Sequence, residues 1–124
     1  MKKTIFEYLY RDASNYKAYG AILLQGLITP AEQKTLQDCF EDYQFFVAEQ
    51  VGIPALYEEL FQYSDGPTED DHTYHEFLLL RPASAKESRE LKLWGSTERL
   101  LTAFTNAKGQ WDISLSPNSD PYLW

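Results

Sequence analysis

The N-terminal part of the chain has the side-chain pattern of two strands. In residues 3–10, aromatic and β-branched side chains dominate, and neither face of the strand is simply polar. Turn-forming residues follow at 11–15, and residues 16–25 form a second strand pattern. We expect the two strands to pair as an antiparallel hairpin. Ala18, Gly20 and Ala21 should leave room there for a helix or for aromatic rings.

The segment from Thr29 to Gly52 predicts one long helix. Thr29 can cap its N-terminus, Pro30 suits the first helical position, and Glu32 completes a capping box. Gly52 is a typical helix stop. At helical spacing the apolar residues predict a buried stripe of Leu36, Phe40, Tyr43, Val47 and Val51, with Cys39 and Phe46 at its edge.

The opposite side of this predicted helix is acidic, with one large apolar residue in it. Its members, which we predict to bind a partner, are Asp38, Glu41, Asp42, Phe45 and Glu49. Burial of Phe45 by the protein's own sheet would be awkward from that side. We expect a basic partner protein, a second copy of the chain or residues 122–124 to cover the ring. The alternative is a single exposed phenylalanine, which is common on protein surfaces.

The second half of the chain predicts shorter elements. Residues 53–66 favour a short helix that begins at Pro54, and residues 75–81 read as a buried strand closed by Pro82. Residues 83–90 favour an exposed connection or the start of a frayed helix. Residues 90–94 fit either an edge strand or a helix, because five residues do not reveal a period.

The last predicted elements are a helix and a strand. Ser96 can cap a helix that ends at Gly109, and residues 110–115 alternate as a half-buried strand does. The predicted order is therefore β-β-α-α-β-α-β. It indicates a single α+β domain over residues 1–124, with a mainly antiparallel sheet of about four strands and helices packed on one face.

Charge is distributed unevenly along the chain. The formal net charge is −8, and between Glu32 and Glu76 twelve acidic residues accompany a single basic residue, Lys34. Such a field opposes direct binding to a nucleic-acid backbone and favours a basic partner. The alternative is that the acidic residues serve solubility.

Cysteine content and hydropathy predict the cellular compartment of the protein. The one cysteine, Cys39, cannot form an intramolecular disulfide and suits a reducing compartment. No apolar segment is long enough to predict a membrane span or a secretory leader. We therefore expect a cytoplasmic protein with no membrane partner.

Two clusters carry the remaining candidate chemistry. The first predicts a divalent metal site, with zinc as an example, at Asp71, His72, His75 and Glu76. On a strand the two histidines would face opposite ways, so such a site needs a bulge, and an acidic loop leading into the strand is the alternative. The second predicts a recognition loop at Arg11, Asp12, Asn15 and Lys17, with an ordinary solvated turn as the alternative.

These observations favour a non-enzymatic protein. The chain has no glycine-rich phosphate loop, nucleophile elbow or H-E-x-x-H motif. We expect a small interaction module, of the inhibitor or immunity type, that binds a basic partner protein without a cofactor. The alternative function is a metal-binding protein or metal-dependent enzyme that uses the Asp71 to Glu76 cluster.

Overall fold

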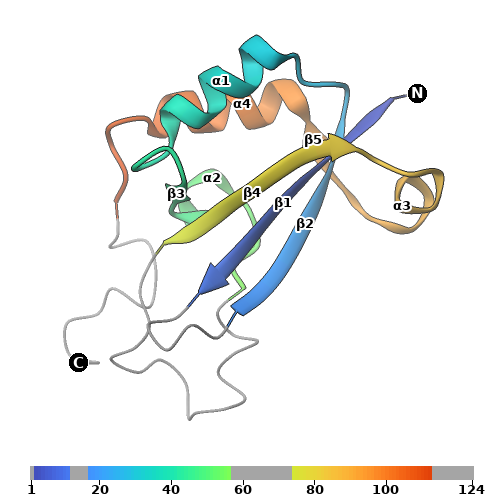
Figure 1. Cartoon of the computed structure of the whole chain (residues 1–124), viewed down its shortest axis with the longest axis horizontal. Helices are drawn as coiled ribbons and strands as arrows, with labels where there is room; N and C mark the ends of the chain where they lie inside the picture. Colours follow the sequence, from blue (N-terminus) through green and yellow to red (C-terminus); the bar gives the residue numbers. More distant parts are fainter. Residues whose placement is uncertain (1, 12–16, 57–73, 113–124) are drawn as a thin grey trace.

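The computed structural model describes residues 2–11, 17–56 and 74–112, and within them an α+β fold (Figure 1). The elements in chain order are β1 (Lys3–Arg11), β2 (Lys17–Gln25), α1 (Pro30–Cys39), β3 (Phe45–Phe46), α2 (Ala48–Val51), β4 (His75–Pro82), α3 (Ala85–Glu90), β5 (Leu93–Ser96) and α4 (Thr97–Ala107). The predicted fold class is confirmed. The sheet has five strands, in the order β3-β4-β1-β2-β5, where about four were expected.

The sheet is built around β1. This strand pairs antiparallel with β2 in an unbroken register from Lys3↔Gln25 to Arg11↔Lys17, which confirms the predicted hairpin. On its other side β1 pairs antiparallel with β4. Ile5 and Phe6, which point to opposite faces of β1, are both fully buried, as the lack of a polar face predicts.

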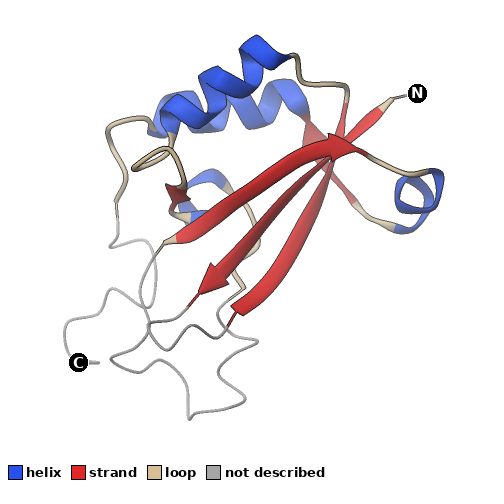
Figure 2. Ribbon diagram, in the orientation of Figure 1, coloured by secondary structure: helices blue, strands red, loops and turns tan. Residues whose placement is uncertain are grey.

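An aromatic core lies between the sheet and three helices. α1, α2 and α4 cover one face of the sheet, and α1 lies beside α4 (Figure 2). Phe6 of β1, Phe46 of β3 and Phe104 of α4 meet there with ring centroids 5.5–6.1 Å apart. Aromatic pairs at such distances add to the stabilisation that burial alone provides.

Gly20 shows why β2 contains small residues. It lies opposite Tyr8 in the hairpin register. A Cβ atom at Gly20 would be 3.0 Å from Cζ of Tyr8 and 2.8 Å from a methyl carbon of Leu56. The expectation that small side chains make room for neighbouring rings is therefore confirmed at this position.

The single helix predicted from Thr29 to Gly52 is wrong in its second half. Its start is confirmed, because Thr29 and Glu32 form the capping box at the beginning of α1. The helix ends at Cys39, however, and the chain passes through a turn into β3 before α2 begins. Gly52 does end α2, in the left-handed conformation.

The physical reason for this break lies in the core. Most residues from Phe40 to Val47 are aromatic, β-branched or aspartate, which favour helix only weakly. On a continuous helix, Phe46 would lie only at the edge of the buried stripe. In β3 its side chain is fully buried, and its backbone pairs with His75 of β4. Tertiary packing therefore overrides the helical period.

The later elements follow the sequence more closely. The strand ending at Pro82 is confirmed as β4, and the helix that Ser96 caps is confirmed as α4. The expectation that the strand is buried is correct only for residues 75–77, because Leu78 and Leu79 are exposed. For residues 84–94 the sequence did not decide between helix and strand. The structure has the helix α3 there, with a capping box from Ser84 and Glu87, followed by the edge strand β5. β5 runs parallel to β2 and pairs with its last residues, Leu23 to Gln25.

Two predicted elements find only partial or no support. Residues 110–112 are not a strand, and the rest of that predicted strand lies outside the described residues. Trp111 instead packs on Phe104, at a centroid distance of 5.7 Å, and donates a hydrogen bond to the carbonyl of Cys39. Residues 53–56 are not helical, and the remainder of the predicted helix 53–66 is also outside the described residues.

No helix in the described residues has the length and apolarity to cross a membrane.

An ion-pair network fixes α3 against the end of β4. The guanidinium of Arg81 donates two hydrogen bonds to the carboxylate of Glu87, at 2.7 and 2.6 Å, and also binds Glu7 of β1. These bonds to Arg81, with the backbone N–H of Ser84, lower the pKa of Glu87 to about 2. The network sets which side of α3 faces the sheet.

We predict that Phe40→Ala destabilises the protein by roughly 3–5 kcal/mol. Phe40 is 6% exposed, and its ring packs 5.1–5.8 Å from Phe46, Phe77 and Phe104. Chemical denaturation measures the change, with Tyr19→Ala as the control at a ring that is 63% exposed. The control should lose less than about 1 kcal/mol. Equal effects of the two substitutions would contradict the described core.

We also predict that Glu87 makes the protein less stable in acid. Its folded pKa of about 2 lies below its ordinary value of 4.5. The stabilisation is therefore complete above pH 4.5 and is lost as the pH falls from there toward 2. Glu87→Gln keeps a capping side chain without a charge, so its melting temperature should fall less steeply over that interval. Identical slopes for variant and wild type would refute this role of Glu87.

Candidate functional site

A tight turn joins α1 to β3 and projects acidic side chains. Glu41 and Phe45 exchange two backbone hydrogen bonds of 2.8 Å, so residues 42–44 form the tip. Asp38, Glu41, Asp42 and Tyr43 are all exposed at or beside this tip. We call these four residues the acidic turn.

The tip has an unusual backbone. Asp42 and Tyr43 have φ angles of 51° and 60°, and they are the two non-glycine residues with positive φ in the described part of the chain. Tight turns with positive φ at successive residues usually contain asparagine and glycine. A bulky side chain in the left-handed region costs roughly 1–2 kcal/mol. Tyr43 therefore holds a strained conformation.

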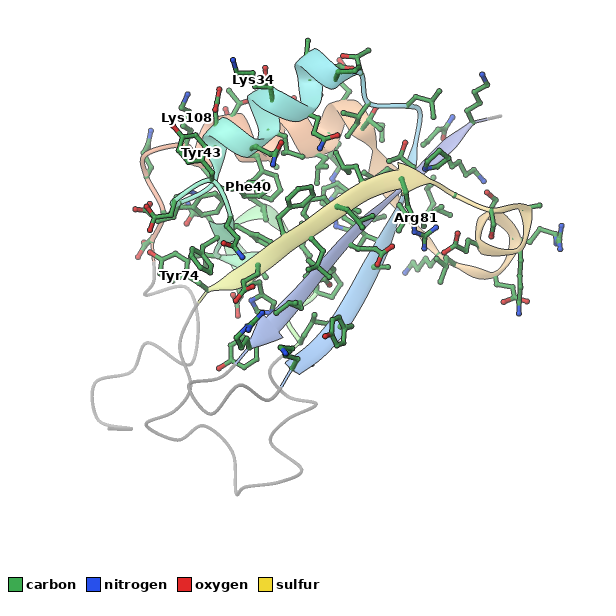
Figure 3. All side chains as sticks on the ribbon, viewed as in Figure 1. Lys34, Phe40, Tyr43, Tyr74, Arg81 and Lys108 are labelled. Carbon is green, nitrogen blue, oxygen red and sulfur yellow. The ribbon has the colours of Figure 1, made fainter. Side chains whose placement is uncertain are left out.

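The sequence-based placement of Tyr43 in the core is wrong. Its side chain is 70% exposed, and in Figure 3 it lies near the end of α1, on the same side of the molecule as Lys34 and Lys108. The error follows from extending the helical period beyond Cys39. The sequence signals for the turn were Asp42, since aspartate is a turn former, and the weak helix preference of residues 40–47.

The turn is held to the sheet by its last residues. The backbone N–H of Phe77 donates to the carbonyl of Gln44 at 2.8 Å, and the Gln44 amide donates to Glu76 at 3.1 Å. Glu76 in turn pairs with Arg11 of β1, 3.2 Å away. These bonds anchor Gln44 and leave the acidic side chains of the tip pointing to solvent.

The charges of the acidic turn act on their neighbours. Burial, followed by the negative charge of Glu41, raises the pKa of Tyr74. Within the described residues, Asp38, Glu41 and Asp42 form no ion pair. The turn therefore presents three carboxylates whose charge is not neutralised by a salt bridge from that part of the protein.

Two predicted partner-binding residues, Phe45 and Glu49, are not among the exposed side chains of the acidic turn, although Phe45 closes the turn through its backbone. Phe45 is in β3 rather than on the polar side of a helix, and it is half-buried, with its ring centroid 6.2 Å from that of Tyr74. Glu49 is half-buried in the first turn of α2. Of the predicted residues, Asp38, Glu41 and Asp42 are thus exposed between the last turn of α1 and the tip, together with Tyr43. Whether this surface binds a partner stays a prediction.

Cys39 has the environment of a structural thiol. It is 3% exposed, and its Sγ donates to the carbonyl of Thr35 at 3.2 Å. Burial raises the pKa of the thiol, against smaller opposing effects of Thr105 and Lys108. A raised pKa keeps the group protonated and poorly nucleophilic.

The predicted metal cluster is described only in part. Asp71 and His72 lie outside the described residues, so the four-residue site stays a prediction. His75 is fully buried among Tyr8, Tyr10 and Phe46, and its Nε2 accepts a hydrogen bond from the backbone N–H of Leu56 at 2.9 Å. Glu76 leaves β4 on the opposite face, toward Arg11. Among the residues that the structure describes, no three metal-ligating side chains converge.

The predicted recognition loop is also only partly described. Asp12 and Asn15 lie outside the described residues. Arg11 is engaged by Glu76, and Lys17 is exposed at the start of β2. The two cations face each other as the last pair of the hairpin register.

No protein-family model, curated protein or solved structure matches the chain. Its function is therefore argued from its own geometry and charge.

Proposed function

We propose that this protein is a non-enzymatic interaction module whose acidic turn binds a basic surface of a partner protein. The observation that carries the proposal is Tyr43, a bulky residue in the left-handed conformation whose ring is 70% exposed. Burial of the ring within this fold does not offset the free-energy cost of this conformation. Strained residues that persist in folded proteins concentrate at functional sites.

The chemistry of the acidic turn suits a cationic partner. Asp38, Glu41 and Asp42 offer carboxylates to lysine or arginine, and charged hydrogen bonds of this kind are stronger than neutral ones. The face of the Tyr43 ring attracts a cation as well. Tyrosine and arginine are also among the residues that dominate binding energy at protein interfaces.

The proposed way in which the protein acts follows from the acidic turn, which projects from the fold and is held in place. Gln44 ties the turn to β4, so the acidic side chains are presented without a large conformational change. Docking would place three carboxylates over the partner's basic surface. Such a module works as an inhibitor or immunity-type protein does, by occupying that surface, and it requires no cofactor of its own.

We predict that Tyr43→Gly leaves the fold as stable as the wild type or stabilises it by up to about 1 kcal/mol. Glycine relieves the positive φ of 60° but has more conformational freedom in the unfolded chain. Tyr19→Gly is the matched control, because Tyr19 is also exposed but lies in β2. The control should lose roughly 1 kcal/mol, as glycine weakens a strand. Urea unfolding distinguishes the two, and a loss above about 1 kcal/mol for Tyr43→Gly would mean that the ring supports the fold.

We further predict that charge at the acidic turn controls partner binding. Immobilised wild-type protein should retain a basic protein from lysate at ~0.15 M salt, and less of it as the salt concentration rises. Asp42→Lys and Tyr43→Gly should each weaken this binding at least tenfold. Glu90→Lys, at an exposed position of α3, is the charge-matched control and should bind as the wild type does. Retention that is equal for all four proteins would refute the proposal.

A further inference from the structure

A cavity lies beside α3. Figure 1 shows α3 at the opposite end of the sheet from β3, and so away from the acidic turn. The volume of the cavity is about 650 Å³, within the range of small-molecule sites. The residues that line it include Lys2, Lys3, Leu27, Pro82, Ser88 and Arg89. It forms where the start of β1, the segment after β2, the end of β4 and α3 meet.

Backbone hydrogen bonds hold the walls of this cavity together. The N–H of Gly26 donates to the carbonyl of Lys2 at 3.0 Å, and the N–H of Ala83 donates to the carbonyl of Lys3 at 2.9 Å. The first residues of β1 are therefore fixed on both sides. The lysine side chains extend from an ordered backbone.

The orientation of α3 directs a cation to the cavity and its carboxylates elsewhere. Ala85, Ser88 and Arg89 line the cavity, at the spacing that places residues on one helical face. Glu87 is on another side of the helix, where it binds Arg81. Glu90 is also outside the lining. The ion pair of Arg81 with Glu87 thus holds Arg89 toward the cavity.

The charge of the cavity is opposite to that of the protein. Lys2, Lys3 and Arg89 line it together with no aspartate or glutamate, although the chain has a net charge of −8. None of these three cations forms an ion pair within the described residues. Like charges that line one cavity without a counter-ion repel one another, so a bound anion would stabilise the arrangement.

The remaining wall adds an apolar component. Leu27 is 47% exposed there, and Pro82, Ala83 and Ala85 extend the same lining. We propose that this cavity binds a small amphipathic anion, in which a phosphate or carboxylate group is carried on a short apolar body. The anionic group meets Lys2, Lys3 and Arg89, and the apolar body covers Leu27 and Pro82. This site is independent of the acidic turn.

Titration of the full chain with phenyl phosphate, followed by ¹H–¹⁵N NMR, tests the proposal. The backbone amides of Ala83, Ser88 and Arg89 should shift as the site fills, with a dissociation constant below about 1 mM. Inorganic phosphate should bind at least fivefold more weakly, and phenol should not bind. Absence of saturable shifts at these amides, or equal affinity for inorganic phosphate, would overturn the proposal.

Variants separate this site from general electrostatic attraction. Arg89→Glu should weaken phenyl phosphate binding at least tenfold, whereas Lys34→Glu, an exposed charge reversal on α1, should not. Leu27→Ser keeps all the cations and should lose the preference for phenyl phosphate over inorganic phosphate. Unchanged amide signals outside the cavity confirm that each variant is folded. Equal losses in Arg89→Glu and Lys34→Glu, or an unchanged preference in Leu27→Ser, would contradict the proposed site.

Discussion

Burial of Phe46 is the constraint from which much of this structure follows. Its ring contacts Phe6, Tyr8, Phe40 and Phe104 and is fully buried. To bring Phe40 and Phe46 into the same core, the chain must leave the helix after Cys39 and reverse direction within a few residues. The reversal occurs at Asp42 and Tyr43, where φ is positive. The positive φ angles at the surface thus follow from packing inside, whereas a bulky tyrosine at position 43, where glycine would be unstrained, does not.

Much of the fold can be predicted from the sequence, because local sequence signals and tertiary packing favour the same structure at most elements. The capping boxes at Thr29 and Ser84 mark true helix starts, and the aromatic and β-branched residues of β1 mark a strand buried on both faces. Where the local preference of a segment agrees with its tertiary packing, its secondary structure can be predicted from its own residues. Residues 40–47 are the exception. There, the helical period and the strand at Phe45–Phe46 both bury apolar residues, and only the position of β4 selects between them.

The candidate site was predictable in charge but not in shape. The acidic block identified Asp38, Glu41 and Asp42, because net charge along a chain needs no knowledge of folding. Tyr43 could not be found in this way, since its exposure depends on where α1 ends. The same limit applies to the cavity beside α3. Lys2, Leu27 and Arg89 are far apart in sequence, and only the ends of β1, β2 and β4 bring them together.

The place of β1 in the sheet has a consequence for the order in which the chain acquires structure during synthesis. β1 and β2 are neighbours in sequence, so their hairpin can close before the ribosome has completed β4. The other edge of β1 has its partner only when residues 76–82 emerge. Until then an apolar strand keeps a row of unpaired backbone groups, which is an opportunity for pairing between nascent chains. Completion of β4 both closes the core and removes that exposed edge.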